Sequence, residues 1–209
     1  MHETVLKELE AIDHVSQRVG TAISIFGSAR ITPDSEWFHL TRQIAAHLSD
    51  SGYTVISGGG PGIMRAANEG ARNGKTKTIG FNISLQFEPL NNKFQDISLV
   101  FENFYTRKLA FVKCSSAFIV MPGGMGTLDE LFEILTLMQT RKIRVSPVVL
   151  VGSAFWGGLV GWLRENLESA GLINVGELDE IRIFDDATAI SQFIRDTVAI
   201  TDASKLLSA

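Results

Sequence analysis

A glycine-rich turn followed by two carboxylates is the part of this sequence best equipped for chemistry. The apolar run 117–121 predicts a buried strand, and a helical pattern opens at Thr127. Between them lies a turn made of Pro122, Gly123, Gly124 and Gly126. A strand, a glycine turn and a helix start in this order direct backbone N–H groups and the positive end of a helix dipole at an anion. We therefore expect a phosphorylated ligand here, with Asp129 and Glu130 within one helical turn of it.

Carboxylates beside an anion site need a reason to be there, because like charges repel. The pattern Thr127-x-x-Glu130 is that of a capping box, in which Glu130 would bond back to the backbone of the N-cap residue. Catalysis by Glu130 is the other interpretation, and the pattern alone leaves both open. Glu133 shares a helical face with Glu130 and is either a second wall of the site or a solvated charge.

Two further glycine turns also follow apolar runs that predict strands. Gly27 and Ser28 come after the run 22–26, and the glycines of 58–62 come after the run 53–57. Turns at the carboxyl ends of strands in a doubly wound sheet share one rim, and ligands bind along that rim. The glycines of a single turn could be there only to allow a tight bend of the backbone, whereas three such turns on one rim predict a nucleotide-like ligand.

Strands and helices alternate along the whole chain. The expected strands are 22–26, 53–57, 76–81, 97–101, 117–121, 147–151 and 181–184, and the expected helices are 2–19, 33–51, 61–73, 103–114, 127–140, 156–167 and 187–200. Helices of this length between strands predict a parallel sheet covered on both faces. We predict an α/β fold, doubly wound and Rossmann-like, as a single nucleotide-binding domain over 1–209. An outer N-terminal helix would occupy 1–20, and 82–96 would be an irregular loop over one edge of the site.

Composition narrows the functional class. The 209 residues are 45% hydrophobic and 20% charged with a net charge of −4, which gives no support for binding to nucleic acid or to an anionic membrane. The sequence has no apolar run long enough to span a bilayer, no N-terminal signal pattern and one cysteine, so we expect a cytoplasmic protein. The four histidines lack ligand spacing, so neither a metal nor another cofactor is expected.

Two familiar phosphate-binding motifs do not fit. The dinucleotide fingerprint G-x-G-x-x-G is absent after the first predicted strand. Gly74-Lys75-Thr76 looks like the end of a P-loop, but Glu69 stands where its first glycine should be, and the triplet precedes a strand. We therefore exclude a dinucleotide-dependent dehydrogenase and a P-loop NTPase.

Four segments together resemble the Lonely Guy family of cytokinin riboside 5′-monophosphate phosphoribohydrolases, which are often labelled lysine decarboxylases. The segments are Phe26-Gly27-Ser28-Ala29-Arg30, Ser57-Gly58-Gly59-Gly60-Pro61-Gly62-Ile63-Met64, Arg107-Lys108 and Pro122-Gly123-Gly124-Met125-Gly126-Thr127-Leu128-Asp129-Glu130. The family hallmark, an Arg-Lys pair followed by P-G-G-x-G-T-x-x-E, is complete. The N-terminal helix and the 82–96 loop are more similar to the longer bacterial branch.

The resemblance implies hydrolysis of the N-glycosidic bond of a nucleoside 5′-monophosphate, such as AMP or a cytokinin riboside monophosphate, without a cofactor. It also implies that Arg107 and Glu130 are catalytic. The implied substrate-binding residues are Gly27, Ser28, Gly58, Gly59, Gly60, Met64, Lys108, Pro122, Gly123, Gly124, Gly126, Thr127 and Glu133, with Asn91 and Asn92 as weaker candidates. The family is dimeric or larger, so a homo-oligomer is expected, with the helix 104–112 and the helix after Glu130 at the interface.

Two other functions remain open. A non-catalytic carrier of a nucleotide or of molybdenum cofactor would have the same glycine turns but would not need Arg107 and Glu130 together. A decarboxylase would need a lysine that binds pyridoxal phosphate, and Lys108 is the candidate on this rim.

Overall fold

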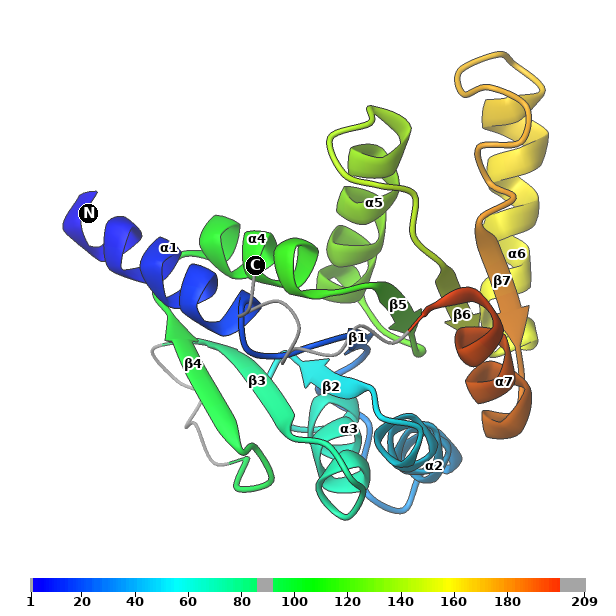
Figure 1. Cartoon of the computed structure of the whole chain (residues 1–209). Coiled ribbons are helices and arrows are strands. Elements are labelled where there is room, and N and C mark those ends of the chain that lie inside the picture. The colour runs from blue at the N-terminus through cyan, green and yellow to red at the C-terminus, as the bar shows by residue number, and fades with distance from the viewer. Residues whose placement is uncertain (1, 86–91, 200–209) are drawn as a thin grey trace.

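A parallel sheet of seven strands forms the centre of the computed structural model, which describes residues 2–85 and 92–199 (Figure 1). The strands are β1 (Ala22–Phe26), β2 (Thr54–Ser57), β3 (Thr78–Ile83), β4 (Ile97–Phe101), β5 (Ala117–Val120), β6 (Val148–Val151) and β7 (Ile181–Phe184). Their order across the sheet is β4-β3-β2-β1-β5-β6-β7, and every neighbouring pair is parallel. The predicted doubly wound α/β fold is confirmed.

The strand order reverses between β1 and β5. The chain starts at the centre with β1, moves outward to β4 and returns to the centre with β5. In open α/β sheets, ligands bind beside the carboxyl ends of the strands at such a reversal. The turns that follow β1 and β5 are the glycine turns at Gly27 and at Pro122, so the topology places both at the expected binding position.

Helices cover both faces of the sheet. They are α1 (His2–Ser16), α2 (Glu36–Asp50), α3 (Ile63–Arg72), α4 (Phe104–Cys114), α5 (Met125–Gln139), α6 (Ser153–Leu163) and α7 (Ala187–Thr197), and a π-helical turn, Arg164–Glu168, continues α6. Residues of α1, α4, α5 and α6 pack into one hydrophobic core, and those of α2, α3 and α7 pack into the other. Successive strand residues point to opposite faces, so Phe26 joins the first core and Ile25 the second.

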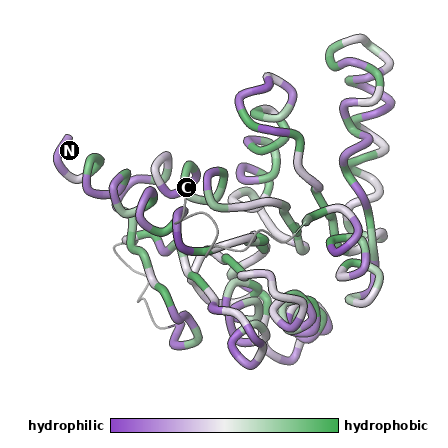
Figure 2. Tube along the Cα trace, viewed as in Figure 1, coloured by the Kyte–Doolittle hydropathy of each residue, from purple (hydrophilic) through white to green (hydrophobic). Residues whose placement is uncertain are grey.

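The helices are amphipathic, as expected of elements with one buried side. Figure 2 shows hydrophobic and hydrophilic residues alternating around their turns. In the part of the chain that the structure describes, every helix is too short or too polar to traverse a lipid bilayer.

The N-terminal helix α1 lies beside α4, as Figure 1 shows and the contacts between the two helices confirm. It lies on the outside of the domain as predicted, but its inner face is well anchored. Ile12 and Val15 are buried in the first core. The carboxylate residue Glu8 of the same helix is also buried, with only 6% of it exposed.

Several predicted boundaries are wrong for identifiable local reasons. The helix expected from Pro33 starts at Glu36, because the Ser35 side chain caps it by accepting a hydrogen bond from the Trp37 amide. Pro61 lies before α3 and not in its first turn, since Gly62 is the N-cap with a φ of 63° that favours glycine. Strand β3 continues through Asn82 and Ile83, which were expected in the loop.

Candidate functional site

The three glycine turns meet at one pocket. Ser28 in the first turn donates its backbone N–H to the Pro122 carbonyl in the third, over 3.1 Å. The Ser28 carbonyl in turn accepts the backbone N–H of Ile63, at the start of α3, over 3.0 Å. Beside them is a cavity of about 640 Å³. Of the predicted site residues it is lined by Gly27, Ser28, Gly58, Gly59, Gly60, Met64, Arg107, Gly124, Gly126, Thr127 and Glu130.

Helix α5 begins two residues before the predicted position. Its N-cap is Gly124 and its first helical residue is Met125, and no side chain caps it. Thr127 is therefore inside the first turn, and the capping-box interpretation of Thr127 and Glu130 is wrong. The first N–H groups of a helix have no acceptor within the helix, and the residues that carry them here, Met125, Gly126 and Thr127, line the cavity. This end of the cavity suits an anion.

Glu130 points its carboxylate at the same cavity from one turn further along α5. Only 16% of its side chain is exposed. Burial raises the pKa of Glu130 from 4.5 to about 7. The Arg107 guanidinium and, more weakly, the Lys108 ammonium oppose that rise in pKa. The carboxylates of Asp129 and Glu133 add to it. A carboxyl that titrates near neutral pH can exchange protons with a substrate or with water under physiological conditions.

Arg107 reaches the pocket from α4 and is 8% exposed. Its Nε donates to the Phe81 carbonyl over 2.7 Å, and its Nη2 donates to the Gly58 carbonyl over 3.2 Å. The guanidinium carbon lies 5.5 Å from the centre of the Phe111 ring, a cation–π contact. These contacts hold Nη1 at 3.9 Å from Oε1 of Glu130. The predicted pair thus faces one cavity from two different helices.

Gly58 has to be glycine because of this arginine. A Cβ at Gly58 would lie 2.3 Å from Nη2 of Arg107 and 2.5 Å from the sulfur of Met64. Both side chains occupy the space that a larger residue would need. The second glycine turn therefore serves a close approach between its backbone and the arginine.

Four predicted site residues do not line the cavity: Lys108, Pro122, Gly123 and Glu133. The Lys108 ammonium lies 3.3 Å from a carboxylate oxygen of Asp129 and 3.3 Å from one of Glu133. Although burial opposes it, these two carboxylates raise the pKa of Lys108 above its ordinary value. Gly123 gives room to Thr127, whose hydroxyl would lie 2.1 Å from a Cβ placed there.

Other pocket residues were missed from the sequence: Ala29, Arg30, Pro61, Asn82, Ile83, Leu85, Phe104 and Met125. Asn82 and Ile83 were missed because the polar stretch after Gly80 reads as a loop, although it completes β3. Arg30 had a usable signal, since it follows the first glycine turn directly. Its positive charge at the pocket suits a phosphorylated ligand.

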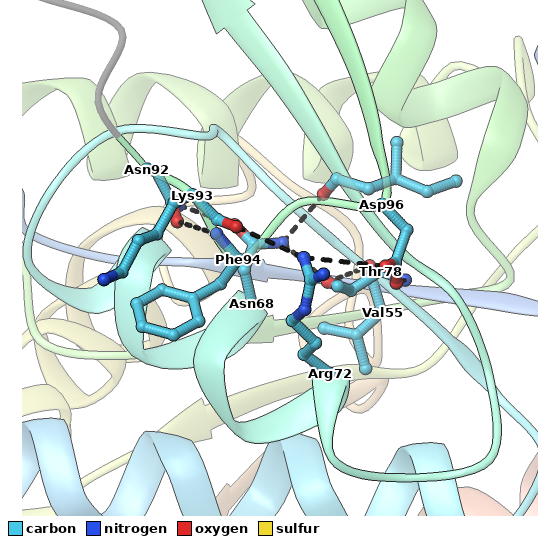
Figure 3. A network of polar contacts seen from close by, with 9 residues as sticks. Val55, Asn68, Arg72, Thr78, Asn92, Lys93, Phe94 and Asp96 are labelled. Carbon is cyan, nitrogen blue, oxygen red and sulfur yellow. Dashed lines mark hydrogen bonds and ion pairs between the residues drawn. The ribbon is translucent and has the colours of Figure 1, made fainter.

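A polar network joins Asn92 to Asn68 of α3, as Figure 3 shows. Asn92 donates to Asn68 over 2.9 Å and to the Gly60 carbonyl over 3.4 Å, and Gln95 donates to the Gly59 carbonyl over 2.9 Å. Asn92, a weaker candidate for substrate binding, does not line the cavity and instead braces the turn. Asn91 lies outside the described residues.

Within residues 2–85 and 92–199, no group of three or more His, Cys, Asp or Glu side chains is arranged to hold a metal ion. Cys114 is buried, and desolvation raises its thiol pKa to about 12, so it is not a nucleophile near neutral pH. The ionisable side chains that line the cavity are Glu130, Arg107 and Arg30.

Comparison with known proteins connects this geometry to a family. A family model described as possible lysine decarboxylase matches residues 64–194. A cytokinin riboside 5′-monophosphate phosphoribohydrolase of Mycobacterium tuberculosis is 31% identical over 159 residues, which cover 73% of this chain and 82% of that protein. A pyrimidine/purine nucleotide 5′-monophosphate nucleosidase of Escherichia coli is 28% identical over 53% of this chain and 27% of its own length.

A solved structure is also similar. It is the molybdenum cofactor binding protein of Rippkaea orientalis, with a TM-score of 0.61 and 21% sequence identity, covering 85% of this chain and 96% of that one. At this identity the similarity concerns the fold alone.

Proposed function

This chain belongs to the Lonely Guy family, the one described as possible lysine decarboxylase, and we propose that it hydrolyses nucleoside 5′-monophosphates at the N-glycosidic bond. The products are the free base and ribose 5-phosphate. The observation that carries the proposal is the pairing of Glu130 with Arg107 across a cavity walled by three glycine turns. An anion site alone would not need the carboxylate of Glu130, whereas cleavage of this bond can use both groups.

The phosphate binds at the start of α5. The backbone N–H groups after Gly124 and the hydroxyl of Thr127 contact its oxygens, and Arg30 supplies positive charge from the first turn. Holding the phosphate fixes where the ribose lies, because the two are covalently joined. The anomeric carbon then lies one sugar away from the phosphate, beside Glu130. This separation explains why a carboxylate can stand near an anion site without competing for the anion.

Glu130 acts in its ionised form. Breaking the bond between sugar and base builds positive charge on the sugar ring, and a carboxylate in a poorly hydrated cavity stabilises that charge. With a pKa of about 7, Glu130 can also take the proton of the attacking water. Its proton is then available to the departing base.

Arg107 positions the substrate and keeps Glu130 ionised. Its guanidinium lowers the pKa of Glu130, against the effect of burial. The bonds to the Phe81 and Gly58 carbonyls fix the direction of its remaining nitrogen. Lys108 acts indirectly, by forming ion pairs with Asp129 and Glu133 on α5.

The reaction can be tested directly by incubating the protein with AMP and with isopentenyladenosine 5′-monophosphate and measuring free base and ribose 5-phosphate. We expect both products, and Glu130→Gln should lower kcat by roughly 10²–10⁴-fold. Glu10→Gln, which removes an exposed carboxylate of α1, is the matched control and should retain full activity. Release of no base from any nucleoside monophosphate would contradict the proposal.

The two alternatives make different predictions. A carrier would bind AMP tightly without turnover, and the fold shared with a molybdenum cofactor binding protein is the observation that keeps this alternative in view. A pyridoxal phosphate enzyme needs a neutral lysine, but Lys108 is held charged by two carboxylates away from the cavity. Adding pyridoxal phosphate should therefore produce no Schiff-base absorbance.

We also propose that the chain acts as one nucleotide-binding domain and assembles as a homodimer or larger homo-oligomer. Exposed apolar side chains gather on α4 and α5, the two helices that carry the catalytic pair: Phe104, Tyr105, Leu109, Met125 and Phe132. Burying them against a second copy would remove apolar surface from water. Light scattering on the wild type and on Leu109→Glu tests this, with a smaller assembly expected for the variant. The single unpaired cysteine is the reason for placing the protein in the cytoplasm.

A further inference from the structure

Helix α1 carries a buried carboxylate, Glu8, that is outside the cavity and unaccounted for by the reaction. Three donors bind it, all from the segment that starts α4. The Glu102 amide donates to Oε1 over 2.6 Å, Asn103 Nδ2 donates to Oε2 over 3.1 Å, and the Thr106 hydroxyl also donates to Oε2. A carboxylate is rarely buried unless hydrogen-bond donors surround it in this way. Glu8 therefore has a defined and oriented set of partners.

These contacts hold the residues at the start of α4. The N-cap residue of α4 is Asn103, and its side chain makes no capping hydrogen bond. Glu8 supplies a negative charge at this helix N-terminus from another element, which suits the helix dipole. Burial alone would raise the pKa of Glu8, but the hydrogen bonds from Thr106, Glu102 and Asn103 outweigh it and lower that pKa. Glu8 therefore remains ionised at neutral pH.

The first turn of α4 also carries Arg107. Thr106, the residue before it, binds Glu8 and the Asn103 carbonyl through one hydroxyl. The Arg107 guanidinium extends in another direction, to the Phe81 and Gly58 carbonyls. The backbone of this turn therefore carries the guanidinium that reaches toward Glu130.

We propose that Glu8 is a positioning residue, which fixes the first turn of α4 and through it the Arg107 guanidinium beside Glu130. Helix α1 is then part of the machinery of the site, although it contributes nothing to the cavity wall. The inference rests on the proposed function for its kinetic consequence only. Its geometric consequence, the distance of Arg107 from Glu130, can be measured without any substrate.

The substrate-free measurement is a carbon NMR titration of the Glu130 carboxyl in wild type and in Glu8→Gln. Glutamine keeps the size of Glu8 but loses the charge and turns one acceptor into a donor. The charged groups that act on Glu130 are Arg107 and Lys108 of α4 and Asp129 and Glu133 of α5. Because Arg107 lowers the pKa of Glu130, its withdrawal in Glu8→Gln should raise that pKa by about 0.5 or more.

Kinetics supply the second measurement. A displaced guanidinium should lower kcat for AMP by about tenfold, since misplacement of a catalytic group by an ångström can cost more than that. The loss should disappear when Glu8→Gln is combined with Arg107→Ala, because both changes then remove the same contribution. Thr106→Val, which removes one donor and leaves α1 intact, should give a smaller effect of the same kind.

The control is Ile12→Val, a change on the same buried face of α1. It should lower the melting temperature and leave both the Glu130 pKa and kcat unchanged. If Glu8→Gln behaves like Ile12→Val, Glu8 only stabilises the fold and the proposal is overturned. If the protein cleaves no nucleotide but the Glu130 pKa still moves in Glu8→Gln, the proposed function has failed and the positioning role stands.

Discussion

Glu130→Gln should make the protein more stable at pH 8, because the folded state holds an ionised carboxylate in a poorly hydrated cavity. The pKa of Glu130 is about 7 in the folded protein against an ordinary value of 4.5. Each tenfold change in a protonation equilibrium is worth about 1.4 kcal/mol, so this rise corresponds to roughly 3 kcal/mol. The side chain is only 16% exposed, which keeps solvent screening small.

The direction of this change in stability follows from proton binding. Between pH 4.5 and about 7 the folded protein holds the Glu130 proton more tightly than the unfolded chain does. This contribution to stability is complete below pH 4.5 and is lost as the pH rises through about 7. Glutamine cannot ionise, so the variant keeps its stability at high pH.

The assay is thermal or urea unfolding of both proteins at several pH values. At pH 8 the variant should gain roughly 3 kcal/mol, or about 6–12 °C in melting temperature for a chain of this length. The gain should shrink toward zero near pH 4.5. Glu10→Gln should show no such trend. A loss of stability in Glu130→Gln at all pH values would refute this reasoning.

Three other results are expected. The kcat/KM for AMP should rise with pH and level off above about 7, since Glu130 acts ionised; a profile that falls with pH would make it a general acid. Gly58→Ala should cost about 10–100-fold in kcat/KM by displacing Arg107, and it should also lower the melting temperature because buried hydrogen bonds of the guanidinium are lost. Its control is Gly157→Ala, in α6 with nothing within 4 Å of the added Cβ, which should keep activity and add about 0.5–1 kcal/mol of stability. Arg30→Ala should raise the KM for AMP by about threefold to tenfold and leave kcat nearly unchanged, because the lost charge faces the phosphate in ground state and transition state alike.

The fold was predictable from the sequence because its signals are local. Each buried strand is a short apolar run, and each glycine turn follows one of them. Parallel order then brings the turns together without any knowledge of long-range contacts. Arg107 and Glu130 were found from the family hallmark, and the structure brings both to one cavity.

What the sequence could not reveal depends on long-range contacts or on glycine. Glu8 and Thr106 are 98 residues apart, and nothing in either neighbourhood marks them as partners. The start of α5 was misplaced because Gly124 and Gly126 allow helix and turn alike, and only the surrounding structure decides between them. Lys108 was placed on the rim because it neighbours Arg107, but consecutive helix residues point in different directions.

The hydrogen bonds that join the three glycine turns affect the thermodynamics of binding. Ser28 links the turn after β5 to the start of α3, so backbone hydrogen bonds join all three turns. A glycine-rich loop that is free in solution loses conformational entropy when it closes on a ligand. Here that entropy is lost during folding, before any ligand arrives. If the phosphate binds at these turns as proposed, its site is preorganised, and its binding energy remains available to orient the sugar toward Glu130.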